Sequence, residues 1–179
     1  MSDRQEADIV LRAISRAARS HAGQWRRDGV TPYVAHPLRA MTVLVQVFGV
    51  EDPQLLAAAA LHDTIEDTAV DFDDLLEEFG LEVARAVALL SKDTRLRKDE
   101  RERAYVAALA EAPVGVQLCK LADVYDNLID SRGATAQQRS KTVGKASAWL
   151  QTFRGSVERD WPRVLEAVQG QLERTRGVL

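Results

Sequence analysis

The sequence is poor in residues that cross-link a protein or anchor it in a membrane. Its single cysteine, Cys119, allows neither an intramolecular disulfide nor a cysteine-based zinc cage. The longest apolar run, residues 55–61, is far shorter than the roughly 20 residues that cross a bilayer. Residues 1–6 are polar and lack the apolar centre of a signal peptide. We therefore expect a cytoplasmic protein with no membrane segment.

An excess of basic charge is also lacking. The chain has 24 basic and 27 acidic residues, which gives a net charge of -3 and no general attraction to nucleic acids. Basic and acidic residues alternate in segments such as 98–103, which is typical of ion pairs on a helix surface. We expect no nucleic-acid partner, and nothing in the pattern indicates an oligomeric state.

Helical periodicity runs through almost the whole chain. Apolar residues recur at spacings of three and four, whereas strand-like alternation is scarce. The length and the 46% hydrophobic content suit one core, so we expect a single all-α domain over residues 1–179. The expected helices cover about 6–23, 36–48, 53–63, 72–80, 81–90, 100–110, 114–132 and a C-terminal region from 136. The C-terminal aromatic residues, including Trp149, Phe153 and Trp161, are expected to close the core rather than to form a dimer face.

Two of the expected helices, 53–63 and 114–132, are so apolar that each must be buried nearly all round. The first ends in His62-Asp63. Glu66 lies four residues after His62 and Asp67 lies four residues after Asp63, so the two members of each such pair are expected to share a helix face. Three carboxylates and an imidazole are costly to bury without a cation. A divalent metal removes that cost.

Two further residues complete a candidate metal site. His36 begins the second helix, and Asp123 lies inside the other apolar helix. With His62 and Asp63 they supply two nitrogens and two carboxylates and leave open positions on a six-coordinate ion, which suits manganese or iron better than a thiolate-selecting metal. The residues alone leave another interpretation open, since a single buried histidine is often a core residue and a buried aspartate is often a cap.

The motifs around these residues resemble those of the HD superfamily, and in particular the hydrolase domain of the RelA/SpoT proteins. The motifs are His21-Ala22-Gly23-Gln24, Arg26-Arg27, Thr31-Pro32-Tyr33-Val34-Ala35-His36-Pro37-Leu38, Ala60-Leu61-His62-Asp63-Thr64-Ile65-Glu66-Asp67-Thr68 and Lys120-Leu121-Ala122-Asp123. The resemblance covers about residues 18–130. The long members of this family continue into synthetase and regulatory domains, for which this sequence has no counterpart. We therefore expect it to resemble the single-domain small alarmone hydrolases most.

The resemblance implies a compact helical HD-domain bundle that binds a small nucleotide and hydrolyses the 3′-pyrophosphate of guanosine alarmones. The products would be GDP or GTP plus pyrophosphate. It places a manganese ion, or another divalent metal, on the four residues His36, His62, Asp63 and Asp123. It assigns Glu66 and Asp67 to orienting or deprotonating the attacking water. It assigns substrate binding to Arg26, Arg27, Tyr33, Lys98 and Asn127.

The sequence departs from the family pattern after the last metal aspartate. Two positions that are often basic are Val124 and Ile129, and one that is often histidine is Asp126. These changes keep other substrates open: an adenosine alarmone, the 2′-phosphate of NADPH or another phosphorylated nucleotide. A third hypothesis is a catalytically silent nucleotide sensor, which the presence of Glu66 and Asp67 disfavours.

Overall fold

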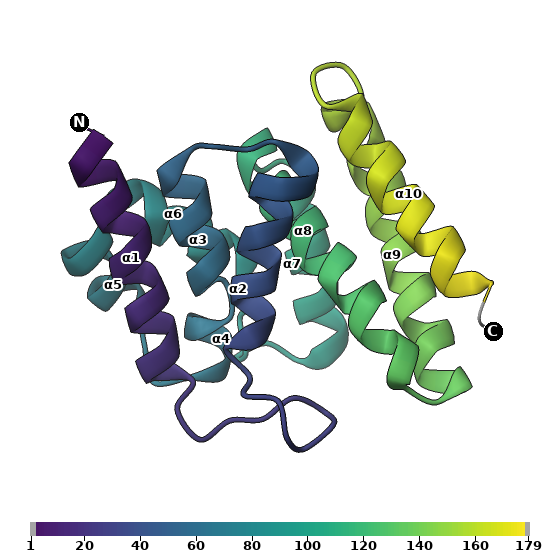
Figure 1. Cartoon of the computed structure of the whole chain (residues 1–179), viewed down its shortest axis with the longest axis horizontal. Coiled ribbons are helices and arrows are strands. Elements are labelled where there is room, and N and C mark those ends of the chain that lie inside the picture. Colours follow the sequence, from purple (N-terminus) through teal and green to yellow (C-terminus); the bar gives the residue numbers. More distant parts are fainter. Residues whose placement is uncertain (1–2, 178–179) are drawn as a thin grey trace.

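The computed structural model describes residues 3–177, with side chains from residue 8 onward, and this part of the chain is helical (Figure 1). The elements are α1 (Asp3–Ser20), α2 (Ala35–Val43), η1 (Leu44–Phe48), α3 (Pro53–Leu61), α4 (Thr64–Asp67), α5 (Phe72–Phe79), α6 (Leu81–Leu90), α7 (Lys98–Ala110), α8 (Val114–Asp130), η2 (Ser131–Gly133), α9 (Ala136–Val157) and α10 (Pro162–Arg176). Within residues 3–177 the one strand-like pairing is an isolated bridge between Trp25 and Pro32. The all-α expectation is confirmed.

Helix α3 lies at the centre of the N-terminal part, where α1, α2, α6 and α8 pack against it. Asp52 caps its first turn by accepting hydrogen bonds from two backbone amides, and Pro53 follows at the first helical position. The four alanines 57–60 are almost completely buried. Such small side chains let the neighbouring helices approach on every side, so the expectation of a helix buried all round is confirmed for this segment.

The helix expected over 53–63 ends earlier than the periodicity suggested. Helix α3 stops at Leu61, and His62 and Asp63 form a turn before the short helix α4. The hydroxyl of Thr64 donates to the Leu61 carbonyl at 2.7 Å, and His62 Nδ1 lies 2.8 Å from the Ala59 carbonyl. These side chains compete with the backbone for carbonyls at the end of the helix. The expected continuous helix is therefore interrupted after Leu61, although Asp63 and Asp67 still face the same side, where both contact the Tyr33 hydroxyl.

The second expected helix also changes character along its length. It is α-helical to Val43, widens into the π-helical turn η1, and ends at Gly49, whose φ of 73° is the left-handed conformation that glycine accepts readily. Both Leu44 and Phe48 are buried in this wider turn. The end predicted near residue 48 is confirmed.

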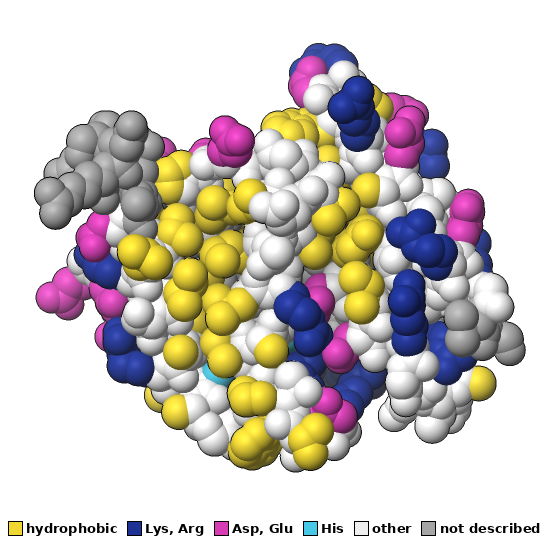
Figure 2. Space-filling model, in the orientation of Figure 1, with side chains coloured by type: hydrophobic (Ala, Val, Ile, Leu, Met, Phe, Trp, Pro, Cys, Tyr) yellow, Lys and Arg dark blue, Asp and Glu magenta, His cyan; other side chains and the backbone are white. Residues whose placement is uncertain are grey.

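The C-terminal helices pack as a layer against α8 at one end of the molecule (Figure 1). Thr135 and Gln138 form the expected capping box at the start of α9. Phe153 is buried, and Trp149 and Trp161 are partly buried against the core, so α9 and α10 close the core as expected. Figure 2 shows hydrophobic side chains gathered over the α1–α3 side of one face, with charged side chains of both signs toward the C-terminal helices. Among residues 3–177 no helix is both long and apolar enough to cross a membrane.

Candidate metal centre and active-site cavity

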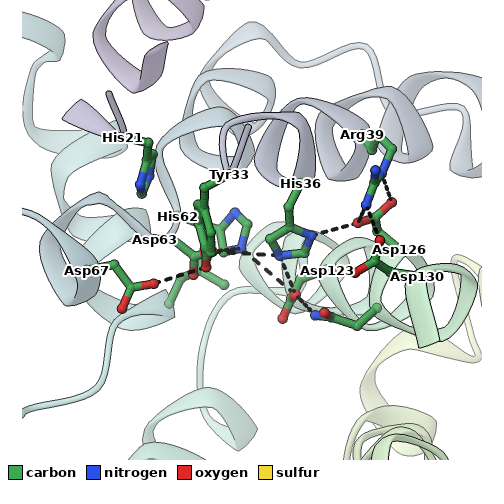
Figure 3. Close-up of polar contacts among 12 residues, drawn as sticks. His21, Tyr33, His36, Arg39, His62, Asp63, Asp67, Asp123, Asp126 and Asp130 are labelled. Carbon is green, nitrogen blue, oxygen red and sulfur yellow. Dashed lines mark hydrogen bonds and ion pairs between the residues drawn. The ribbon is translucent and has the colours of Figure 1, made fainter. Parts of the chain in front are cut away.

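The predicted metal ligands come from three segments that the packing of α2, α3 and α8 brings together (Figure 3). His36 lies in the first turn of α2, His62 and Asp63 lie in the turn after α3, and Asp123 lies in the middle of α8. The two histidines and Asp123 are buried. A buried polar group needs a partner, and these groups find it in one another.

The distances between these side chains describe a tight cluster. His36 Nε2 lies 3.1 Å from Asp123 Oδ1 and 3.6 Å from Asp63 Oδ2. His62 Nε2 lies 3.2 Å from the same Asp63 oxygen and 3.9 Å from Asp123 Oδ1. One ligand atom each from His36, His62 and Asp123 lie within 4.8 Å of one another. The structure therefore brings the four residues named from the sequence to one focus.

The hydrogen bonds of the two imidazoles fit a metal at that focus. Nδ1 of His62 faces the Ala59 carbonyl, and Nδ1 of His36 lies 2.7 Å from Asp126 Oδ2, so both Nδ1 atoms act as donors to these acceptors. In the neutral form of each imidazole, the form that binds a metal, the Nε2 lone pair then points toward the carboxylates. His62 Nε2 is buried and makes no hydrogen bond within the described part of the chain. A cation bound by these lone pairs and carboxylates satisfies all of them.

The pKa shifts show the same excess of negative charge. Burial opposes a charge on His36, but the hydrogen bonds and charges of Asp123, Asp126 and Asp63 outweigh it and raise the pKa of His36 to about 9. Burial likewise opposes ionisation of Asp123, yet Lys120 and the two histidines hold its pKa well below the usual range. The cluster attracts positive charge, which a metal ion supplies.

Glu66 and Asp67, the predicted catalytic pair, lie on α4 beside the cluster. The Tyr33 hydroxyl lies 2.8 Å from Asp63 Oδ2 and 3.0 Å from Asp67 Oδ2, and it ties these two carboxylates to one side of the site. Glu66 Oε2 accepts a hydrogen bond from the Lys92 backbone amide at 3.1 Å. Both carboxylates line the same cavity as the histidines.

This cavity has a volume of about 350 Å³, which is within the range of small-molecule sites. Arg26, Arg27, Tyr33 and Asn127, four of the five predicted substrate residues, line it. Asp130 Oδ2 accepts from Arg26 Nη2 at 2.7 Å, and the Arg26 guanidinium lies 5.4 Å from the centre of the Tyr33 ring. Asn127 Nδ2 donates to Asp123 Oδ1. Of these contacts, the Arg26–Asp130 bond holds the loop 24–33 against α8.

Lys98 is the predicted substrate residue that the structure does not bring to the cavity. It is exposed at the first position of α7 and is not among the residues of the cavity wall. The linker 91–97 turns Lys92 toward the site in its place, and periodicity does not reveal the course of such a linker.

Three lysines that the sequence interpretation did not assign to the site also line the cavity: Lys92, Lys120 and Lys145. Lys120 Nζ lies 2.7 Å from Asp123 Oδ2 and 5.3 Å from the centre of the Tyr105 ring. The position of Lys120 inside an apolar helix could have indicated that it belongs to the site. No signal existed for Lys145, because the approach of α9 depends on tertiary packing.

The sequence profile described as "HD domain" matches residues 13–149. The chain belongs to the HD-domain family. Its match spans α2, α3, α4 and α8, the elements that carry the metal cluster, and extends into α9 as far as Trp149.

Relatives within the HD-domain family are similar over most of their length. The human guanosine-3′,5′-bis(diphosphate) 3′-pyrophosphohydrolase MESH1 is 39% identical over 133 residues, which is 74% of each chain. The Drosophila melanogaster protein of that name is 33% identical over 175 residues, 94% of this chain and 95% of the relative. A solved structure titled "A metazoan ortholog of SpoT hydrolyzes ppGpp and plays a role in starvation responses" superposes with a TM-score of 0.82 at 30% identity, covering 96% of this chain and 97% of that one. The expected resemblance and fold are confirmed.

Proposed function

We propose that this HD-domain protein is a metal-dependent phosphohydrolase that removes the 3′-pyrophosphate of ppGpp and pppGpp. The observation that carries the proposal is the cluster of His36, His62, Asp63 and Asp123, which opens into a cavity with cationic walls. The human and Drosophila relatives, which are 39% and 33% identical to this chain, are named for that activity. The reaction adds one water and gives GDP or GTP plus pyrophosphate. Because its substrates would be free nucleotides, we place the protein in the cytoplasm.

We infer that His36, His62, Asp63 and Asp123 hold a manganese ion, since two imidazoles and two carboxylates suit that ion. When bound, a divalent ion lowers the pKa of water and polarises a phosphoryl oxygen. The remaining chemistry belongs to side chains of the cavity.

The acidic pair supplies the base. Glu66 and Asp67 lie at the cavity wall, and a carboxylate beside the attacking water accepts its proton as the new P–O bond forms. Tyr33 donates to Asp63 and Asp67 and so fixes the position of this edge of the site. The bond between the 3′ oxygen and phosphorus breaks, and the 3′ oxygen takes up the proton that the carboxylate had accepted from the water.

The cationic wall accounts for an anionic substrate. Arg26, Arg27, Lys92, Lys120 and Lys145 line the cavity. Guanidinium and ammonium groups form charge-assisted hydrogen bonds with phosphate oxygens. Because Asp130 and Tyr33 hold the Arg26 guanidinium in place, its donors are already oriented before substrate arrives.

The test is direct. Purified protein loaded with Mn²⁺ should convert ppGpp into equal amounts of GDP and pyrophosphate, as measured by ion-exchange chromatography. Glu66→Gln should lower kcat by about 100-fold or more, the lower end of what a general base contributes. Glu77→Gln, on the exposed face of α5, is the matched control and should retain full activity. Absence of ppGpp turnover by Mn²⁺-loaded protein would refute this function.

A panel of nucleotides tests the choice of substrate. The panel contains ppGpp, its adenosine counterpart and NADPH, each at equal concentration with Mn²⁺. We expect the highest kcat/KM for ppGpp. A higher kcat/KM for the adenosine compound or for NADPH would keep the metal chemistry and replace the guanosine assignment.

A further inference from the structure

Asp126 occupies a position at which many family members have a histidine. It has no role in the proposed reaction. It lies on α8 three residues after the metal-cluster residue Asp123, and its side chain is only 1% exposed. Its Oδ2 faces His36 Nδ1 at 2.7 Å (Figure 3). The carboxylate therefore contacts a predicted metal ligand from the side opposite the metal cluster.

The buried charge of Asp126 has its own counter-charge. Arg39 Nε donates to Asp126 Oδ1 at 2.6 Å, and Arg39 Nη2 donates to Asp126 Oδ2 at 3.0 Å. Such a two-pronged contact fixes the plane of a carboxylate as well as its charge. Without a partner, a carboxylate at this depth would be strongly destabilising.

The register of α2 against α8 makes this arrangement. His36 and Arg39 are three residues apart and face the same side of α2. Asp123, Asp126 and Asp130 follow at spacings of three and four on α8, and Arg39 Nη2 also donates to Asp130 Oδ1 at 3.0 Å. His36 is thus held between Asp123 on its Nε2 side and Asp126 on its Nδ1 side.

We propose that Asp126 is a positioning residue of the metal centre. It holds His36 with Nδ1–H toward its own carboxylate and Nε2 toward the metal, and Arg39 fixes the Asp126 carboxylate in that orientation. The inference rests on the proposed function in that it takes His36 as a metal ligand. A carboxylate behind a ligating imidazole fixes the ring, selects the tautomer and makes the imidazole a stronger ligand.

The test measures metal affinity rather than turnover. Mn²⁺ is titrated into the metal-free protein, and the signal of free Mn²⁺ is followed by electron paramagnetic resonance. Asp126→Ala should weaken Mn²⁺ binding by about 10- to 100-fold, as loss of such partners does elsewhere. Asp73→Asn is the matched control, because Asp73 is exposed in the first turn of α5, outside the cluster, and its Mn²⁺ affinity should equal that of the unmodified protein. A folded Asp126→Ala protein with unmodified Mn²⁺ affinity would overturn the proposal.

A second variant covers the case in which Asp126→Ala does not fold. Asp126→Asn keeps the shape and an acceptor oxygen but removes the negative charge that strengthens the imidazole, so its Mn²⁺ affinity should fall below that of the unmodified protein. Equal affinity in folded Asp126→Asn would also overturn the proposal, and so would an unmodified protein that binds no Mn²⁺. If Mn²⁺ binds and the Asp126 variants weaken it, but ppGpp is not cleaved, the positioning role stands and the proposed function fails.

Discussion

At the scale of single residues, Tyr33 orders two of the acidic groups of the site. Its hydroxyl lies within hydrogen-bond distance of both Asp63 and Asp67. Burial, and then the charges of these two carboxylates, raise the pKa of Tyr33 above its usual range. The hydroxyl therefore stays neutral and remains a donor at neutral pH.

We expect Tyr33→Phe to lower the free energy of unfolding of the metal-free protein by about 1.5 kcal/mol, the lower end for a hydrogen bond to a charged group. Urea denaturation in the presence of EDTA measures the change. Tyr125→Phe is the control, because Tyr125 packs edge-on against Phe48 and its hydroxyl makes no hydrogen bond within residues 8–177. Equal stabilities of the two variants would contradict the assigned role.

Cys119 provides a prediction on pH. Burial between helices raises the pKa of its thiol from 9.0 to about 12. Between these values unfolding releases a proton, so the contribution of the thiol to stability falls as the pH rises above 9.0. The stability advantage of the unmodified protein over Cys119→Ala should be constant below pH 8. It should then shrink above pH 9 by up to about 1.4 kcal/mol per pH unit, the value of one unit of pKa. Urea denaturation across this range measures it, and a constant difference would disprove the shift.

At the scale of elements, the glycines of helices and of turns should respond to alanine in opposite ways. Gly144 lies inside α9, and a Cβ built there meets no atom within 4 Å. Gly49 ends η1 with a positive φ. We expect Gly144→Ala to raise the free energy of unfolding by about 0.5–1 kcal/mol and Gly49→Ala to lower it by about 1–2 kcal/mol. Urea denaturation compares the two, and changes of the same sign would contradict the assigned conformations.

The elements also show which parts of the fold could be predicted from the sequence. Periodicity and capping residues located the helices, since Asp52-Pro53 and the pair Thr135 and Gln138 act through neighbours a few residues away. The break in the helix after Leu61 was not predicted. It depends on the side chains of His62 and Thr64, which form hydrogen bonds with backbone carbonyls. Local rules do not specify which of several polar side chains wins such a competition.

The candidate site divides in the same way. The sequence predicted the candidate metal cluster and the acidic pair because charged groups beside apolar helices need partners, and the structure places these residues around one cavity. Lys145 was not predicted, because only the docking of α9 brings it to the cavity. The contact between Asp126 and Arg39 was not foreseen either, since it joins residues 87 positions apart.

At the scale of the whole molecule, we propose that residues 1–179 form one domain. The buried side chains run continuously from Ile9 in α1 to Leu172 in α10. A single core unfolds as one cooperative unit. Thermal unfolding followed by far-ultraviolet circular dichroism and by tryptophan fluorescence should give the same midpoint. Two separate transitions would divide the chain into independent units.

Metal binding should stabilise this whole unit. An ion that binds only the folded state adds about 2.7 kcal/mol at a concentration 100-fold above its Kd. We therefore expect Mn²⁺ to raise the Tm and EDTA to reverse the rise. Asp123→Asn, which removes a charged oxygen from the cluster, should show a much smaller rise. A Tm that does not respond to Mn²⁺ in the unmodified protein would argue against the metal site.

The burial of α3 on all sides affects which residues of such a protein can be substituted during evolution. The predicted metal residues lie on or next to helices that pack closely around α3, where the alanines 57–60 are almost completely buried. Residues of the loop 24–33, of the linker at Lys92 and of α9 also line the cavity and lie outside this tightly packed centre. Preference among nucleotides can therefore drift by exchange of these peripheral residues while the hydrolytic machinery is inherited intact.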